Sequence, residues 1–270
     1  MSERVETERD ETWWYGPPLT VTPSVDSDVD RRLQIAAIIP ALNEATTIAD
    51  AVREVYAVEP LLAEFDATIK VFVVDNGSTD RTAEFAAVAG ATVISEPVRG
   101  YGRACWAGVL AAGGAEVIAL LDGDRSDVPQ EMPRLLRPLL ANQADLVIGS
   151  RALGDHEPGS LLPQQVVGNW IAARLLRLLF GVTVTDIGPF RVIRRQTLVT
   201  LGMREMTYGW SVEMIARAAR QGRRVQEVPV TYRKRAGGTS KVSGNVRASV
   251  KAGARITAAI IRCRFGIDGH

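Results

Sequence analysis

The chain has 270 residues, of which 46% are hydrophobic and 23% charged, and its formal net charge is +1. This size fits one large α/β domain or two small ones, and the near-neutral charge argues against a nucleic-acid partner. Its two cysteines and two histidines are too few for a disulfide framework and give zinc or Ser-His-Asp chemistry little support.

The first 32 residues are polar and rich in Asp, Glu, Thr and Pro, apart from the cluster Trp13-Trp14-Tyr15. This composition predicts a disordered leader over residues 1–32. The first residues are charged where a signal peptide has its apolar segment. No run of about 18 apolar residues, the length that spans a bilayer, follows. We therefore expect a cytoplasmic protein.

From Leu33 onward, short β-branched runs alternate with helical stretches. The expected strands are Ile35–Pro40, Lys70–Asp75, Thr92–Ser95, Val117–Asp122 and Leu146–Ser150, and the expected helices are Thr46–Val58, Thr79–Ala89, Arg103–Ala112 and Pro129–Leu140. Apolar strands separated by helices predict a mostly parallel, helix-covered sheet of the Rossmann-like α/β class. Ligands of such folds bind beyond the carboxyl ends of the strands, so the chemistry is expected there.

The pattern changes after Arg151. A Gly/Pro-bearing loop is followed by an apolar helix, Gln164–Phe180, a segment Thr185–Arg194, a helix Trp210–Arg220, a strand Val225–Tyr232, a basic Gly-rich loop and a final helix. We expect this half to continue the first sheet. The predicted domain covers residues 33–243, and a basic amphipathic helix covers residues 244–270.

The first two expected strands end in polar turns. In Pro40-Ala41-Leu42-Asn43-Glu44, Asn43 is compatible with a helix cap, and Glu44 with one wall of a nucleotide site. In Asp75-Asn76-Gly77-Ser78-Thr79-Asp80, the last three residues can cap a helix. Asp75 closes an apolar strand, where its carboxylate can accept a hydrogen bond from uracil or guanine. We expect Asp75 to contact a nucleobase.

Gly100 and Gly102 precede a helix, which favours close approach of the backbone to a phosphate or sugar oxygen. They do not form a dinucleotide fingerprint, because Cys105 stands at the position of the third glycine. No P-loop motif occurs in the sequence either. NAD enzymes and P-loop NTPases are therefore disfavoured.

The fourth expected strand runs into Asp122-Gly123-Asp124. Two carboxylates at this spacing can converge on one Mg²⁺ or Mn²⁺, whose shell is completed by waters and phosphate oxygens. The motif alone is also compatible with a simple strand-to-helix turn. Its place after the fourth strand, with Asp75 after the second, favours a divalent cation that neutralises a departing diphosphate.

Together, these motifs resemble a family 2 glycosyltransferase with the GT-A fold, and are most similar to the dolichyl- and polyprenyl-phosphate sugar synthases. The resemblance runs from Ile35 to Ser243 and includes Gly149-Ser150-Arg151, Asp186-Ile187-Gly188-Pro189-Phe190-Arg191 and Arg235-Ala236-Gly237-Gly238-Thr239-Ser240-Lys241. It implies an inverting transfer, an acceptor-side C-terminal part, and a metal and diphosphate held by Asp122 and Asp124. The predicted nucleotide-sugar site comprises Pro40, Ala41, Asn43, Glu44, Asp75, Gly77, Ser78, Gly100, Gly102, Asp122, Gly123 and Asp124.

The acceptor is less closely defined. The residues expected to hold acceptor phosphates are Arg151, Arg191, Arg233, Arg235, Ser240 and Lys241. Departures from the synthases are Ser126, where Gln is frequent, Pro189, where a small residue is usual, and the lack of C-terminal transmembrane helices in the sequence. These departures bear more on the acceptor than on the donor.

Two acceptor classes stay open. A hydroxyl acceptor needs a general base, for which Glu213 and Asp186 are candidates, whereas a phosphate is already an anion and needs only positioning. Glu213 is equally compatible with a solvated or helix-pairing role. The cationic groups favour transfer from a UDP- or GDP-sugar, UDP being preferred, to a polyprenyl phosphate. The alternatives from other classes are a sugar nucleotidylyltransferase and a non-catalytic nucleotide-sugar-binding module.

Two of the expected helices suggest which partners the protein contacts. The helix Gln164–Phe180 is apolar nearly all round, except for Arg174 and Arg177, and is compatible with a core, homodimer-interface or membrane-contacting helix. The final helix places Arg247, Lys251, Arg255 and Arg262 along one stripe, which is typical of a basic interfacial helix. We therefore expect peripheral attachment at the inner face of the membrane.

Overall fold

The computed structural model describes residues 32–237 and 246–266, the last segment by its backbone alone up to residue 252. The predicted leader up to residue 31, with Trp13-Trp14-Tyr15, and the predicted phosphate ligands Ser240 and Lys241 lie outside the described residues. The chain from Arg32 onward forms one compact unit.

The first half of this unit alternates strands and helices as predicted. Its elements are β1 (Leu33–Ala41), α1 (Ile48–Tyr56), η2 (Glu59–Phe65), β2 (Ala67–Asp75), α2 (Thr82–Val88), β3 (Thr92–Ser95), α3 (Tyr101–Ala111) and β4 (Val117–Leu120). The second half contains η3 (Pro129–Glu131), α4 (Met132–Leu140), β5 (Leu146–Ser150), α5 (Pro163–Phe180), β6 (Arg191–Arg194), α6 (Arg195–Leu201), α7 (Trp210–Arg220), β7 (Val225–Pro229) and α8 (Val246–Phe265). The sequence did not predict η2, α6 or β6.

The seven strands form one sheet in the order β3-β2-β1-β4-β6-β5-β7. All neighbouring pairs are parallel except those of β6, which runs antiparallel to both β4 and β5. The prediction of a mostly parallel α/β sheet is therefore confirmed. Strand β6 was not recognised within the expected segment Thr185–Arg194 because Arg191 and Arg194 leave only Val192 and Ile193 as an apolar run.

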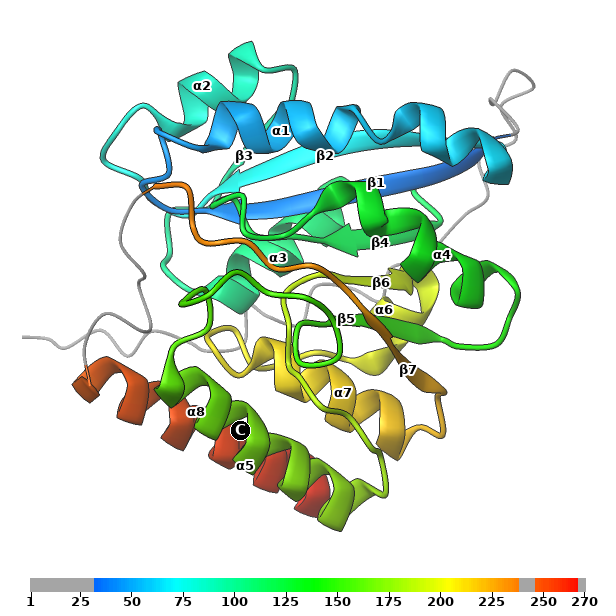
Figure 1. The fold of residues 1–270 in the computed structure, drawn as a ribbon, viewed down its shortest axis with the longest axis vertical. Coiled ribbons are helices and arrows are strands. Elements are labelled where there is room, and N and C mark those ends of the chain that lie inside the picture. The colour runs from blue at the N-terminus through cyan, green and yellow to red at the C-terminus, as the bar shows by residue number, and fades with distance from the viewer. Residues whose placement is uncertain (1–31, 238–245, 267–270) are drawn as a thin grey trace, which may run out of the picture. The chain divides into compact units, whose positions relative to one another are not determined.

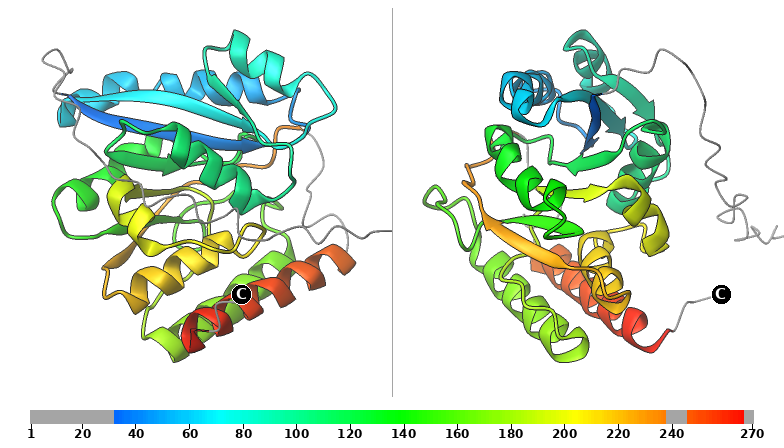
Figure 2. Two further views of the ribbon diagram at one scale, coloured as in Figure 1. Left: turned by 180° about the vertical axis from the view of Figure 1, so that it is seen from behind. Right: turned by 90° about the vertical axis from the view of Figure 1, so that its right-hand side faces the viewer.

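Helices cover both faces of this sheet (Figures 1 and 2). Side chains from α1, α2 and α4 pack on one face, and those from α3, α5, α6, α7 and α8 on the other. Alternate residues of β1 point to opposite faces of the sheet. Ile35, Ala37 and Ile39 face α1 and α4, while Ala36 and Ile38 face α3. Burial of both strand faces explains why the strands read as continuous apolar runs.

Two long helices, α5 and α8, lie side by side at one edge of the unit (Figure 1). In α8, the side chains of Ala259, Ile260 and Cys263 are buried in the same core as the sheet. In α5, the buried residues are Ala172 and Leu176. No described helix is long and apolar enough to cross a membrane.

Two helical glycines provide a matched test of this packing. A methyl group on Gly108 of α3 would overlap Ile38 Cγ2 and lie 3.1 Å from Val74 Cγ2, whereas one on Gly168 of α5 would have no neighbour within 4 Å. We expect Gly108→Ala to lower the free energy of unfolding by about 1–3 kcal/mol because it overpacks the core. We expect Gly168→Ala to raise it by up to about 1 kcal/mol, since alanine is the better helix former. Urea unfolding measures both; shifts of the same sign would contradict the packing of α3.

Candidate active site

The turns that follow β1 and β2 are joined by side-chain hydrogen bonds. Asn43, which has a left-handed backbone with φ 52°, accepts a bond from the Thr79 N–H at 2.8 Å. Its own N–H donates to Ser78 Oγ at 2.9 Å, and the Glu44 N–H donates to Thr82 Oγ1 at 2.8 Å. The two turns expected to line a nucleotide are therefore fixed beside each other.

Asp75 lies between these turns and the edge of the sheet. It is the last residue of β2, in register with Ala41 of β1 and Ser95 of β3. Its Oδ1 atom accepts a bond from the Ser78 N–H at 3.1 Å. Its Oδ2 atom makes no hydrogen bond within residues 32–237 or the described part of α8, so it is available to a ligand such as a nucleobase.

Asn76, which was not predicted as a site residue, organises the loop after β3. Its Nδ2 atom donates to the carbonyls of Glu96 and Val98 at 2.9 and 2.8 Å, and its Oδ1 atom accepts from the Gly100 N–H at 2.8 Å. The side chain is buried. The sequence could have singled out Asn76 by its place in the Asp75-Asn76-Gly77 motif. Its hydrogen-bond partners lie some 20 residues away, however, and nothing in the local sequence indicates them.

Gly100 and Gly102, which were expected to bring the backbone close to a ligand, have N–H groups that are bonded within the protein. The N–H of Gly100 is bonded to Asn76, and the N–H groups of Gly102 and Arg103 donate to the carbonyls of Thr207 and Met206 at 3.3 and 3.0 Å. A Cβ atom on Gly102 would lie 2.9 Å from Met206 Cα. The two glycines therefore allow the segment with Met206 and Thr207, and not a ligand, to approach the start of α3.

An acidic cluster follows β4. The Asp122 N–H donates to Asp127 Oδ2 at 3.0 Å, and both the N–H (at 2.9 Å) and the hydroxyl of Ser126 donate to Asp124 Oδ1. Thr47 Oγ1 donates to the Gly123 carbonyl at 2.9 Å, which ties the turn to the start of α1. Asp127 and Ser126 were not predicted as site residues, although the D-x-D-x-x-D spacing was a usable signal.

The carboxylates of this cluster lie close together in a partly desolvated site, which disfavours their charged forms. Burial, together with the neighbouring Asp124, raises the pKa of Asp122 to about 7. Burial and Asp122 raise the pKa of Asp127 well above its usual value. Within the described residues, the Asp122 carboxylate makes no hydrogen bond or ion pair, although it stays partly accessible. A desolvated carboxylate without donors fits a hard divalent cation.

The described residues contain no group of three or more His, Cys, Asp or Glu side chains arranged to hold a metal by themselves. Asp122 and Asp124 supply at most two protein ligands, which is the usual number for Mg²⁺ bound together with a nucleotide diphosphate. The residues therefore fit a divalent cation whose remaining ligands come from a phosphate-bearing substrate and water.

Arg235 contacts this cluster directly. Its Nη1 atom lies 2.9 Å from Glu44 Oε1 and its Nη2 atom 2.8 Å from Asp124 Oδ2. Arg233, two residues earlier, instead points to Glu54 of α1, with its Nη1 atom 3.4 Å from Oε2. Of the two predicted cations, Arg235 alone pairs with a carboxylate of the D-x-D motif.

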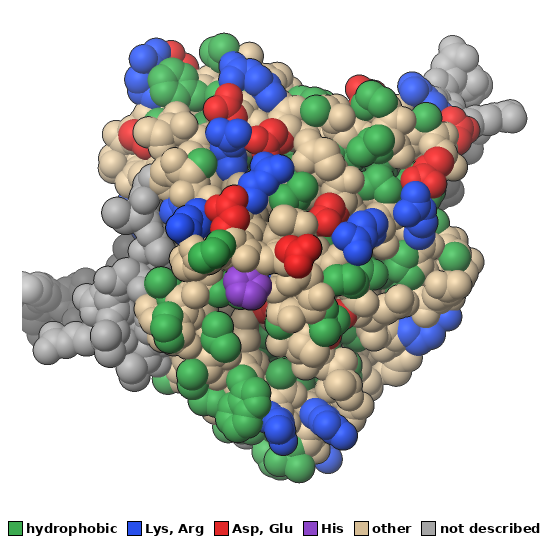
Figure 3. Space-filling model, in the orientation of Figure 1, with side chains coloured by type: hydrophobic (Ala, Val, Ile, Leu, Met, Phe, Trp, Pro, Cys, Tyr) green, Lys and Arg blue, Asp and Glu red, His purple; other side chains and the backbone are tan. Residues whose placement is uncertain are grey.

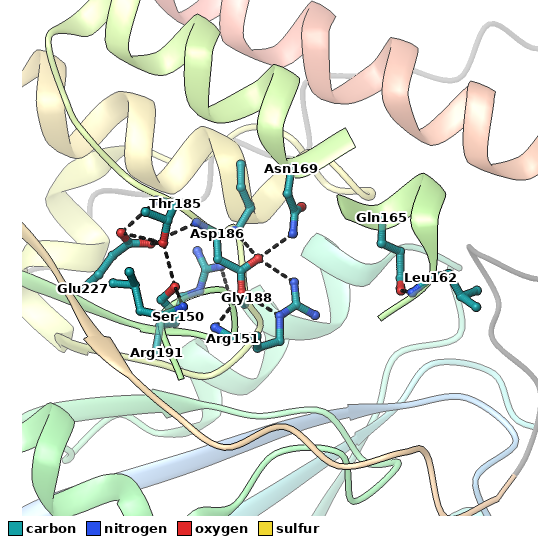
Figure 4. A network of polar contacts seen from close by, with 12 residues as sticks. Ser150, Arg151, Leu162, Gln165, Asn169, Thr185, Asp186, Gly188, Arg191 and Glu227 are labelled. Carbon is teal, nitrogen blue, oxygen red and sulfur yellow. Dashed lines mark hydrogen bonds and ion pairs between the residues drawn. The ribbon is translucent and has the colours of Figure 1, made fainter. Parts of the chain in front are cut away.

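Arg151 is held rigidly by Asp186 (Figure 4). Its Nε and Nη2 atoms lie 2.6 and 2.7 Å from the two carboxylate oxygens, and its main-chain N–H donates to Oδ2 at 3.0 Å. Asn169 of α5 also donates to Asp186. The Arg151 guanidinium stacks on the Tyr232 ring, 4.9 Å from its centroid. Burial alone would raise the pKa of Asp186, but the bonds and charge of Arg151 keep it below its usual value.

Neither expected general base is free to act. The buried Glu213 carboxylate accepts bonds from the N–H groups of Arg204 and Glu205 at 3.0 and 2.7 Å, and pairs with Arg217 Nε at 2.7 Å. The Asp186 carboxylate is saturated with donors and has a lowered pKa, which makes it a weak base. The geometry gives both acids a structural role and does not support either as a base.

Arg191 was expected to hold an acceptor phosphate, and its surroundings in the structure do not support this role. Its side chain is fully buried, and its Nη1 and Nη2 atoms donate to the carbonyls of Ser211, at 2.9 Å, and Gly188. Burial lowers the pKa of its guanidinium. Arg191 therefore joins the segment after α5 to α7 and does not face a ligand.

The Arg151–Asp186 pair leads to a stability prediction. Their side chains are 8% and 2% exposed, so Asp186→Asn leaves a buried guanidinium without a counter-ion, at a cost of about 3–5 kcal/mol in the free energy of unfolding. Glu84→Gln, which breaks the exposed pair of Arg81 and Glu84, is the control and should leave stability unchanged. Urea unfolding at pH 7 compares them; equal stabilities would contradict the network.

The same pair sets a pH dependence. Because the folded-state pKa of Asp186 is lowered, its stabilising contribution is complete above its unfolded pKa of about 3.9. It is lost as the pH falls through the folded value. The difference in stability between the natural protein and Asp186→Asn should therefore shrink on acidification below that pH.

Comparisons with known proteins identify the family of the chain. Residues 36–202 match Glycosyl transferase family 2. The chain is 40% identical over 218 residues to an uncharacterized glycosyltransferase of Mycobacterium tuberculosis, which covers 80% of this chain and 93% of that protein. It is 31% identical over 226 residues to an undecaprenyl-phosphate mannosyltransferase of Micrococcus luteus, covering 79% of this chain and 89% of that protein.

Among solved structures, glucosyl-3-phosphoglycerate synthase from Mycobacterium tuberculosis, in complex with Mn²⁺, UDP-glucose and phosphoglyceric acid, has a TM-score of 0.67 at 24% identity. The match covers 88% of this chain and 81% of that one. This likeness shows the GT-A fold. The family match and the relatives show that the chain belongs to glycosyl transferase family 2 and is a glycosyltransferase.

Proposed function

We propose that the chain transfers a sugar, with inversion, from a nucleoside diphosphate sugar to the phosphate of a polyprenyl phosphate. The observation that carries this proposal is that neither candidate base is free: the carboxylates of Glu213 and Asp186 both accept hydrogen bonds from protein donors. A hydroxyl acceptor needs such a base, whereas a phosphate is already an anion. The undecaprenyl-phosphate mannosyltransferase relative supports a lipid phosphate as acceptor.

The donor half of the proposed site lies at the ends of β1, β2 and β4. Asp75 Oδ2 is available to the nucleobase of the donor, and the turn at Asn43 and Glu44 lies beside it. Asp122 and Asp124 would hold Mg²⁺ or Mn²⁺, which would supply positive charge to the departing diphosphate. The UDP-glucose and Mn²⁺ in the structural neighbour support UDP as the donor nucleotide.

The acceptor half is built around Arg151. With Nε and Nη2 fixed by Asp186, its Nη1 atom makes no hydrogen bond within the described part of the chain. The Arg151 charge lowers the pKa of Asp122, so the guanidinium lies near the donor half. A fixed guanidinium at this place can bind an acceptor phosphate and orient it toward the sugar.

A transfer assay tests this proposal. Labelled UDP- and GDP-sugars are incubated with the protein, Mn²⁺ or Mg²⁺, and either a polyprenyl phosphate or the corresponding polyprenol. We expect label in the lipid fraction only with the phosphate and only with the divalent cation. Transfer to the polyprenol and not to its phosphate would contradict the proposal.

The acceptor class also predicts the behaviour of Glu213→Gln. Because Glu213 anchors main-chain groups and Arg217, this variant should melt several degrees lower yet keep its turnover within about threefold below its melting temperature, whereas loss of a general base costs about 10²-fold or more. Asp122→Asn is the comparison and should lose turnover without a comparable fall in melting temperature. A hundredfold loss in folded Glu213→Gln would favour a hydroxyl acceptor.

The proposed acceptor is a membrane lipid, and α5 is the described surface best suited to approach it. Its exposed side chains are Val166, Val167, Trp170, Ile171 and Leu178, interspersed with Arg174 and Arg177 and with no acidic residue. Figure 3 shows hydrophobic and basic side chains over this helix. The Arg174 guanidinium lies over the Trp170 ring, 5.1 Å from its centroid. An apolar face with cations fits the surface of an anionic bilayer.

Flotation with anionic liposomes at low salt tests the role of α5. The natural protein should co-migrate, and Trp170→Asp should reduce co-migration because it puts a charge into the apolar face. Val88→Asp, at a 77% exposed position in α2, is the matched control and should float normally. Unchanged flotation of Trp170→Asp, with a change from dimer to monomer in solution, would instead assign α5 to the predicted homodimer interface.

A further inference from the structure

Arg235 bridges two acids that belong to different turns. Glu44 follows β1 and Asp124 follows β4, and their side chains are only 8% and 5% exposed. The Arg235 side chain is 27% exposed, so the guanidinium closes the acidic cluster from the accessible side. It supplies the positive charge that two neighbouring, partly desolvated carboxylates require.

This bridge makes the two carboxylates of the D-x-D motif unequal. Asp124 has both oxygens occupied: Oδ1 by the N–H and hydroxyl of Ser126, and Oδ2 by Arg235. Asp122 has no such partner among the described residues. A divalent cation that approaches Asp122 therefore meets the charge of Arg235 and finds Asp124 already taken.

The side chain of Arg235 can leave without undocking its segment. The Arg233 N–H donates to the Ser126 carbonyl at 2.8 Å, and the Ala236 N–H donates to the Asp124 carbonyl at 3.1 Å. These main-chain bonds hold residues on both sides of Arg235 against the turn and do not involve the guanidinium. The carboxylates are almost buried, but the guanidinium is 27% exposed, so it can move toward solvent when another cation takes over their charge.

We propose that Arg235 is a resident counter-cation of Asp124 that the divalent cation and nucleotide displace together, after which its guanidinium binds the diphosphate. This inference rests on the proposed function and adds an order of events. The free protein binds the cation weakly, because Arg235 competes for Asp124. The nucleotide favours exchange, because its phosphates offer Arg235 new acceptors.

Binding of Mn²⁺ alone to the ligand-free full chain tests the competition, with free Mn²⁺ measured by electron paramagnetic resonance. Arg235→Gln should bind Mn²⁺ about tenfold more tightly than the natural protein, which corresponds to about 1.4 kcal/mol. Arg233→Gln removes the same charge from the same segment but from a pair with Glu54, and should stay within twofold. Equal affinities of Arg235→Gln and Arg233→Gln would overturn the inference.

The same titration with UDP present tests the second half. There the effect should reverse: Arg235→Gln should bind Mn²⁺ and UDP more weakly than the natural protein, because the diphosphate has lost a guanidinium partner. If Arg235→Gln still binds Mn²⁺ more tightly than the natural protein when UDP is present, Arg235 only repels the cation. A purely structural role would move both titrations in the same direction.

Thermal melting of each variant checks folding. If Arg235→Gln is unfolded, Arg235→Lys keeps the charge but contacts one carboxylate at a time, and should show the same gain in Mn²⁺ affinity on a smaller scale. Absence of that gain overturns the inference. A natural protein that binds no Mn²⁺ even with UDP contradicts the proposed metal-dependent function itself, which separates the two failures.

Discussion

Negative charge concentrated at the end of β4 is the constraint on which the rest of the site depends. Asp122, Asp124 and Asp127 lie within six consecutive residues, and burial and mutual repulsion raise the pKa values of Asp122 and Asp127. Such a cluster is stabilised either by protonation or by cations nearby. The surrounding chain provides them as Arg235 and Arg151, both of which lower the pKa of Asp122.

The two arginines meet this requirement differently. Arg151 is almost fully buried and has its own carboxylate, Asp186, so its position is fixed. Arg235 is more exposed and shares acids that belong to the proposed donor site. A fixed guanidinium suits an acceptor phosphate that must be oriented, and an exchangeable one suits a site that alternates between an empty and a metal-bound state.

The sequence predicted the sheet and the strand-end turns because both are local patterns. The turns containing Asp75 and Asp122 follow directly from apolar strands whose carboxyl ends meet at one edge. The partners of Glu213 and Arg191 could not be predicted because they depend on the tertiary structure. Arg191, for example, bonds to the carbonyl of Ser211, 20 residues away, and no spacing rule indicates that a charged side chain is buried among carbonyls.

The antiparallel strand β6 explains how the two halves of the site come together. By entering the sheet between β4 and β5, it places the segment just before it, with Asp186, beside Arg151 at the end of β5. Glu227 of β7 accepts the Asp186 N–H at 3.0 Å and so fixes that segment from the far side. Asn169 of α5 donates to the same carboxylate. The exposed helix α5 is thereby connected through Asp186 to Arg151, so a lipid surface that positions α5 would also position the group proposed to receive the lipid phosphate.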